Sequence, residues 1–143
     1  VRSWLQTPFD QFADRLSPNG RWIANSSNQT SRAELWVRPF PGPGAPIRIS
    51  TDGGHDPVWA RDGKELYYEN DGRVFAARVR EDGASMHVDP PQLLFAGAFM
   101  RDDVDLNVRL FDVAPDGRFL MVEPVSSARA PVPAVALHLL SVH

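Results

Sequence analysis

The sequence predicts an all-β fold built from three repeated units. One short phrase, a turn signal that ends in glycine and a basic residue, occurs three times in the 143 residues. The copies are Ser17-Pro18-Asn19-Gly20-Arg21, Ala60-Arg61-Asp62-Gly63-Lys64 and Ala114-Pro115-Asp116-Gly117-Arg118. Each copy leads into an apolar run that contains aromatic residues. Self-similarity at such a period is typical of stacked supersecondary units.

Each repeated phrase has the chemistry of a tight turn. Proline fixes φ near about −65° early in a turn, and glycine supplies the positive φ that closes a hairpin. An Asx side chain before the glycine bonds to the turn backbone. We therefore assign structural turn roles to six residues: Asn19, Gly20, Asp62, Gly63, Asp116 and Gly117.

The runs on either side of these turns predict short strands. We expect strands at about 12–17, 21–26, 34–40 and 46–50 in the first unit, 55–60, 64–69, 73–79 and 92–95 in the second, and 108–114, 118–123 and 134–142 in the third. Several runs, 119–122 among them, are continuously apolar, which indicates strands covered on both faces. No helix-period segment separates the strands, as a parallel α/β sheet would require. Four-stranded antiparallel blades of a β-propeller fit best.

Five segments resemble a known family. They are SPNGRWIA at 17–24, VRPFPGPG at 37–44, STDGG at 50–54, PVWARDGKEL at 57–66 and FDVAPDGRFLM at 111–121. These segments resemble the TolB-like propeller repeats of many bacterial proteins, including those appended to membrane-anchored serine/threonine kinases. The sequence departs from that repeat at Asn19 and Arg61, where the repeat usually has Asp and Pro. The resemblance implies a propeller fold and a role in protein–protein interaction, and the kinase domain itself is not in this sequence.

The blade count predicts a half-propeller. We expect one β-propeller-type domain over 1–143, with blade 1 at about 11–50, blade 2 at about 55–96 and blade 3 at about 108–142. Three blades are too few to close a ring, because propellers typically have four to eight. We expect three strands in the third unit and a spare strand at 3–7 before the first unit. We expect two chains to exchange this strand and complete a six-bladed propeller as a homodimer. The alternative is an excised piece of a longer propeller.

Candidate ligand-binding residues lie where the innermost strands of the blades begin. In a propeller these strands line the central channel, and their ends form its mouth. The six candidates for this channel mouth are Gln11, Arg15, His55, Asp56, Asn107 and Arg109. The competing interpretation is that these side chains are merely solvated or cap the strand starts.

No catalytic, phosphate-binding or metal-binding motif is found in the sequence. Asp103-Val104-Asp105 begins like a calcium loop, but Val108 stands where the loop needs glycine. We therefore expect no catalytic residue, no metal and no cofactor. The favoured function is a non-enzymatic module that binds a protein, peptide or small ligand at the channel mouth. The alternative is a metal-dependent, lactonase-like hydrolase that uses His55, Asp56 and Asn107.

Charge and hydropathy restrict the partners. The formal net charge is −3, which gives no electrostatic support for a nucleic-acid partner. No apolar run approaches the roughly 18 residues that a membrane span needs, so we expect no membrane partner. The sequence has no cysteine, and we expect no signal peptide in the given residues. We expect a soluble chain whose compartment, cytoplasm or periplasm, stays open.

Overall fold

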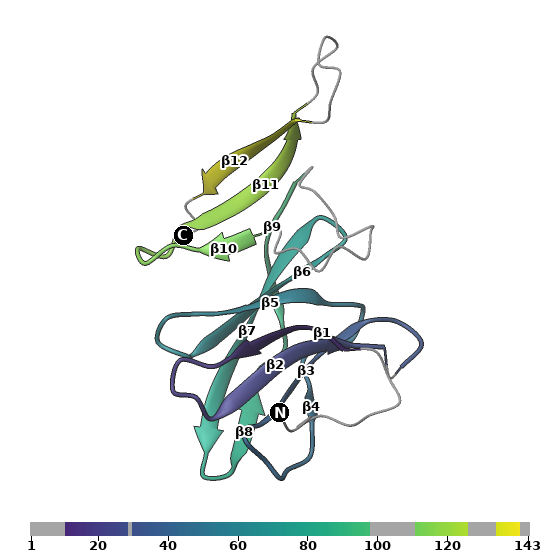
Figure 1. Ribbon diagram of the computed structural model, residues 1–143, viewed down its shortest axis with the longest axis vertical. Helices are drawn as coiled ribbons and strands as arrows, with labels where there is room; N and C mark the ends of the chain where they lie inside the picture. Colours follow the sequence, from purple (N-terminus) through teal and green to yellow (C-terminus); the bar gives the residue numbers. More distant parts are fainter. Residues whose placement is uncertain (1–10, 29, 98–110, 126–133, 141–143) are drawn as a thin grey trace, which may run out of the picture.

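The computed structural model describes residues 11–28, 30–97, 111–125 and 134–140 (Figure 1). Every regular element in these residues is a β-strand, so the predicted all-β class is confirmed. Within the same residues, no helix has the length and apolar character that a membrane crossing requires.

The first sheet follows the first repeated turn. Its four antiparallel strands pair in the order β1-β2-β3-β4: β1 (Gln11–Leu16), β2 (Trp22–Ser27), β3 (Glu34–Pro39) and β4 (Ile47–Arg48). The β1–β2 turn closes through a hydrogen bond of 2.9 Å from the Gly20 N–H to the Ser17 carbonyl. Gly20 has a φ of 72°, a left-handed conformation that glycine adopts without steric cost. The fourth strand is shorter than the predicted 46–50.

The second sheet contains one strand more than the sequence predicts. Its strands are β5 (His55–Trp59), β6 (Glu65–Asn70), β7 (Arg73–Asp82), β8 (Ser85–Val88) and β9 (Gln92–Ala96). The first half of β7 pairs with β9 and its second half pairs with β8. Between the two short strands, the Asp89 N–H still donates to the Arg78 carbonyl at 2.9 Å. β8 and β9 are therefore two parts of one outer strand, interrupted where Pro90 and Pro91 remove backbone donors.

The third sheet has three described strands, in the order β10-β11-β12. They are β10 (Phe111–Val113), β11 (Phe119–Val125) and β12 (Ala134–Leu140). In the described part of the chain, β12 pairs with β11 alone. The expected strand residues 108–110 and the spare strand at 3–7 lie outside the described residues.

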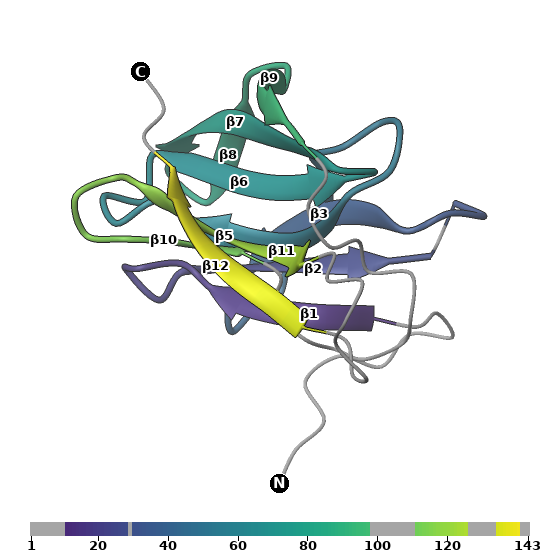
Figure 2. The ribbon, with the colours of Figure 1, turned by 90° about the horizontal axis from the view of Figure 1, so that it is seen from above.

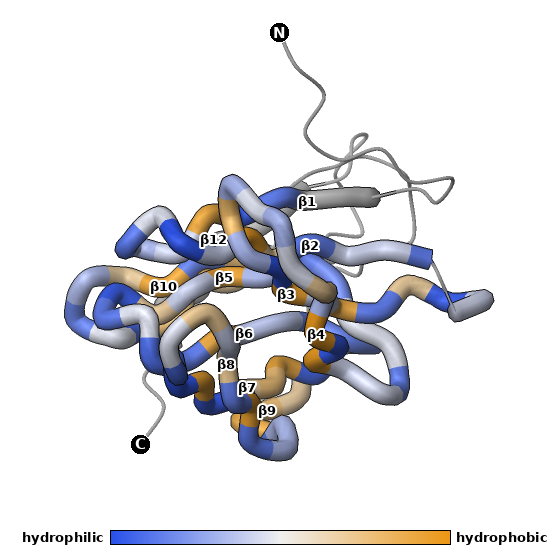
Figure 3. The backbone as a smooth tube through the Cα atoms, turned by 90° about the horizontal axis from the view of Figure 1, so that it is seen from below, coloured by the Kyte–Doolittle hydropathy of each residue, from blue (hydrophilic) through white to orange (hydrophobic). Residues whose placement is uncertain are grey.

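Two apolar cores join the three sheets. The first core lies between the first and second sheets and includes Trp22, Leu35, Val37, Leu66, Tyr68, Val79 and Met86. The second lies between the second and third sheets and includes Val58, Val74, Phe111, Phe119 and Met121. The ring of Phe119 meets the ring of Tyr67 edge-on, with centroids 4.9 Å apart. Burial on both faces explains why these strands are continuously apolar in sequence. In Figure 3 hydrophobic stretches lie along strands, and hydrophilic residues are frequent in the connecting loops.

The first strands of the three sheets are neighbours. β5 contacts both β1 and β10, and the three strands lie in one region of the molecule in Figure 2. The Trp59 indole N–H donates to the Arg15 carbonyl at 3.0 Å, which places the end of β5 beside the end of β1. Neighbouring first strands are the arrangement of innermost blade strands in a propeller.

Candidate functional site

The start of β5 carries two of the predicted ligand-binding residues. His55 is half-buried and stands opposite Glu69 in the β5–β6 ladder. The pairing register shifts between His55 and Val58, which marks a β-bulge. Asp56 lies in this bulge, is 5% exposed and has a φ of 52°. Bulges re-aim side chains and are frequent next to binding and active sites.

Glu69 adds a second buried carboxylate to this end of the sheet. It is 3% exposed, and it accepts the Gly72 N–H at 2.5 Å. Burial raises the pKa of Glu69, and the negative charges of Asp56 and Asp71 raise it further. The Gly72 hydrogen bond and the His55 charge act in the opposite direction and lower the pKa. The start of β5 is therefore an acidic, partly desolvated site with one histidine.

The structure divides the other predicted ligand-binding residues. Gln11 belongs to the same end, because β1 pairs Gln11 with Ser27 and the neighbouring Ser26 hydroxyl donates to the Gly54 carbonyl at 3.1 Å. Arg15 lies at the opposite end of the inner strands, beside Trp59. Asn107 and Arg109 lie outside the described residues. Ligand binding by these residues stays a prediction.

Sequence reasoning missed Glu69. The sequence predicts Glu69 only as the last residue of the strand at 64–69, and no motif marks it. The available signal was hairpin register, because a turn at 60–64 places the start of one strand opposite the end of the next. The bulge after His55 then fixes which residue faces the histidine.

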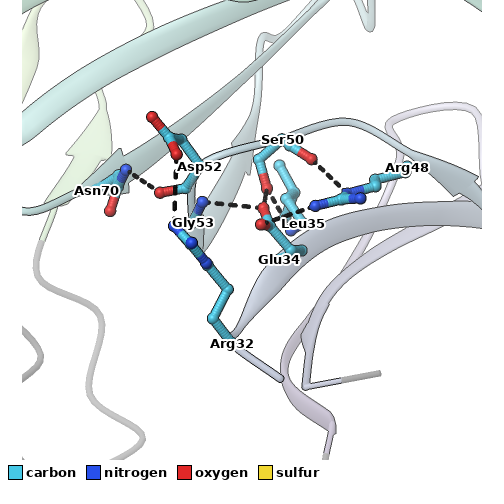
Figure 4. Close-up of polar contacts among 8 residues, drawn as sticks. All are labelled: Arg32, Glu34, Leu35, Arg48, Ser50, Asp52, Gly53 and Asn70. Atoms are coloured by element: carbon cyan, nitrogen blue, oxygen red, sulfur yellow. Dashed lines mark hydrogen bonds and ion pairs between the residues drawn. The ribbon is translucent and has the colours of Figure 1, made fainter. Parts of the chain in front are cut away.

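A second polar cluster holds the connection between the first two sheets (Figure 4). Glu34 is fully buried and pairs with Arg48, whose Nη2 lies 2.9 Å from Glu34 Oε1. The Ser50 hydroxyl donates to Glu34 and accepts the Leu35 N–H at 2.8 Å. The Gly53 N–H also donates to Glu34, at 3.0 Å. These contacts lie within the protein and fix a loop, so we interpret this cluster as structural.

The same connection is tied to the second sheet. The Asn70 amide donates to the Asp52 carbonyl at 2.9 Å, as Figure 4 shows. The Gly54 N–H donates to the Ala33 carbonyl at 3.1 Å. The segment 50–54, which carried part of the family resemblance, therefore positions β5 and with it His55 and Asp56.

A large cleft lies at the opposite end of the inner strands. It has a volume of about 1170 Å³ and is bounded by the turns at 17–19 and 62–64 and by the β7–β8 hairpin. Glu81 from that hairpin accepts hydrogen bonds from Asn19 at 2.7 Å and from the Trp22 indole at 2.6 Å. It also pairs with Arg21 at 2.9 Å. The hydrogen bond from Asn19 lowers the pKa of Glu81 most. The hydrogen bond from Trp22 and the positive charge of Arg21 lower it further. This cleft and the predicted ligand-binding residues His55 and Asp56 therefore lie at different ends of the inner strands.

The remaining turn residues make local contacts. Asp62 accepts the Lys64 N–H at 2.9 Å, and Asp116 accepts the Arg118 N–H at 3.1 Å. Gly63 and Gly117 have φ values of 72° and 86°. Among the residues that the structure describes, no group of three or more His, Asp or Glu side chains is placed to hold a metal ion.

Comparison with known proteins supports the fold alone. No protein-family model matches the chain, and no curated protein matches it. Among solved structures, TolB from Acinetobacter baumannii is similar, with a TM-score of 0.56 at 17% sequence identity. The match covers 97% of this chain and 33% of that one, so the chain spans about a third of its length. At the level of overall architecture, the chain has a TolB-like β-propeller fold.

Proposed function

We propose that this protein is a non-enzymatic interaction module that binds a protein segment or small ligand at the mouth end of its inner strands. The TolB-like fold supports an interaction module. The observation that carries the location is the pair of buried carboxylates, Asp56 and Glu69, beside His55 at the start of β5. No observation in the described residues favours the metal-dependent hydrolase.

The acidity of this site determines the class of ligand. A buried carboxylate is stabilised in its charged form by a nearby cation or by hydrogen-bond donors. The raised pKa of Glu69 shows that its present surroundings supply too little of either. We therefore expect the ligand to present a lysine, an arginine or another cationic donor to His55, Asp56 and Glu69.

NMR titration tests this site directly. Capped tripeptides with a central lysine or arginine are added to the labelled full chain, with aspartate and glutamate tripeptides as the matched control. We expect saturable shifts of the His55 and Asp56 amides with the cationic peptides alone. Equal shifts with both sets, or none with either, would refute the proposed site.

We further propose that two copies complete a six-bladed ring. The support is that β12 has a partner on one edge only within the described residues, and unpaired edges invite a further strand. The strand lent by the partner would be 3–7. Light scattering at micromolar concentration measures the molar mass, which we expect to be twice that of one chain. A mass of one chain across the concentration range would exclude the homodimer.

A further inference from the structure

The cleft of about 1170 Å³ runs along an edge of β7. Val79 lies in the core between the first two sheets. Because successive residues of a strand point to opposite faces, the odd-numbered residues near Val79 face the first sheet. Arg78 and Arg80 face the other way. Residues from both faces of β7, Val79 and Glu81 on one and Arg78 and Arg80 on the other, line the same cleft. A space that touches both faces of a strand must lie beside its edge.

Part of that edge carries backbone groups that no other described strand pairs with. The Val79 N–H donates to the Lys64 carbonyl at 3.0 Å, and the Asp89 N–H donates to the Arg78 carbonyl at 2.9 Å. Neighbouring residues of an antiparallel strand direct their backbone groups to opposite sides. Glu81, two residues after Val79, therefore directs its N–H and its carbonyl toward the side of β6.

No described strand lies there to receive them. β6 starts at Glu65, opposite Arg78, and β7 continues past that point to Asp82. The Lys64 N–H donates to Asp62 Oδ1 at 2.9 Å rather than to the Val79 carbonyl. Within the described residues, the overhanging part of β7 thus has one paired edge, toward β8, and one open edge.

Side-chain contacts anchor the overhang to the first sheet. The Glu81 side chain is engaged by Asn19, Arg21 and Trp22. Arg21 Nη2 also donates to the Gly83 carbonyl at 3.0 Å. An edge held in place by such contacts favours binding, because less conformational entropy is lost when a strand is added.

The two sides of the cleft differ in chemistry. Apolar and aromatic groups face it from the first-sheet side: Trp22, Trp59, Val79 and Met86. Charged groups line the rest of the cleft: the cations Lys64, Arg78 and Arg80 and the carboxylates Asp62, Glu65 and Asp89.

The cations are weakly engaged. The Arg78–Glu65 and Arg80–Asp89 pairs span 3.9 and 4.0 Å, and the two arginine side chains are 77% and 73% exposed. Such exposed ion pairs contribute little to the stability of the fold. The Lys64 ammonium has no ion pair within the described residues.

We propose that an extended peptide segment of a partner protein binds in this cleft and adds a strand to the open edge of β7. Main-chain hydrogen bonds to Glu81 supply affinity, and alternate side chains supply specificity. Because peptide side chains also alternate, the preferred segment has apolar residues toward Trp59 and Met86 and acidic residues toward Lys64. This site is separate from the channel mouth and does not depend on it.

The test uses capped heptapeptides in which aspartate alternates with leucine, valine or phenylalanine, titrated into the labelled full chain. We expect saturable shifts at Glu81 and Lys64 and slower hydrogen exchange of the Glu81 amide. Peptides with lysine in place of aspartate should bind about tenfold more weakly. N-methylation of the peptide nitrogens that face β7 should abolish binding, whereas N-methylation of the alternate nitrogens should leave it intact.

A pair of variants separates this cleft from the rest of the surface. Lys64→Glu should weaken the aspartate peptides about tenfold and favour the lysine peptides. Arg61→Glu makes the same charge change in the same exposed turn, outside the cleft, and should bind as the parent chain does. Shifts confined to His55 and Asp56, absence of saturable shifts at Glu81, or binding that tolerates both N-methylation patterns would overturn the proposal.

Discussion

At the scale of single residues, two buried carboxylates, Glu34 and Glu69, show how surroundings set the role of a side chain. Glu34 and Glu69 are both nearly inaccessible to solvent, yet their surroundings differ. Glu34 has a guanidinium, a hydroxyl and a backbone N–H around it. For Glu69 the described contacts supply one backbone N–H at 2.5 Å. The Glu34 carboxylate is arranged to hold a loop, whereas Glu69 belongs to the ligand site that we propose.

Replacement of Glu34 tests the structural interpretation. Glu34→Ala leaves the buried Gly53 N–H and Ser50 hydroxyl without their acceptor, and each such loss costs roughly 1–3 kcal/mol. We expect the free energy of unfolding to fall by about 3 kcal/mol in urea titrations. Glu65→Ala, which removes a loose surface pair, should cost less than about 1 kcal/mol. Equal losses would contradict the assignment of Glu34.

The raised pKa of Glu69 predicts a pH dependence. The folded chain holds the Glu69 proton more tightly than the unfolded chain, whose ordinary pKa is 4.5. Stability therefore falls as pH rises from this value through the folded-state pKa, and the whole cost is present above it. Glu69→Gln keeps an acceptor for Gly72 and should be more stable than the parent at pH 7, with the difference vanishing below pH 4.5. Thermal unfolding between pH 4 and 8 measures this, and a less stable variant at pH 7 would reverse the interpretation.

At the scale of elements, connections position the strands. The segment 50–54 sets the start of β5, and the β7–β8 hairpin extends over the first sheet. Met86 and Val79 from that hairpin enter the first core. The outer strand of the second sheet therefore stabilises both its own blade and the neighbouring one.

Two glycines with different surroundings test the importance of the connection. A Cβ on Gly54 would meet the Ser50 hydroxyl at 2.8 Å and the Leu35 Cβ at 3.2 Å. Both neighbours are buried, so we expect Gly54→Ala to cost roughly 2 kcal/mol or more through overpacking. Gly83 has a φ of 61° in open space, so Gly83→Ala should cost about 1 kcal/mol. Chemical denaturation measures the loss of stability in both variants. An equal loss, or a larger loss for Gly83→Ala, would refute the steric argument.

At the scale of the whole molecule, two cores unite three sheets, and β12 has a single described partner. Deletion of 1–7 tests the proposed strand exchange. We expect the shortened chain to dissociate at higher concentration than the full chain, because the third sheet would lose its fourth strand. Light scattering with dilution measures this. A shortened chain that remains equally dimeric and equally stable would exclude exchange of that segment.

The sequence by itself determined the turns, most strand positions and the all-β class. These depend on local chemistry: glycine at positive φ in Gly20, Gly63 and Gly117, and apolar runs between the turns. The sequence also located His55 and Asp56 at the start of an inner strand.

Only the tertiary structure decided which distant residues meet. Glu69 faces His55 through a bulged register, Glu34 is buried against Ser50 and Gly53, and β7 overhangs β6 to leave an open edge at the cleft. Pairing register, burial and the length of an overhang are set by packing between segments far apart in the chain. No local pattern encodes them, and they are the features that carry both proposed binding sites.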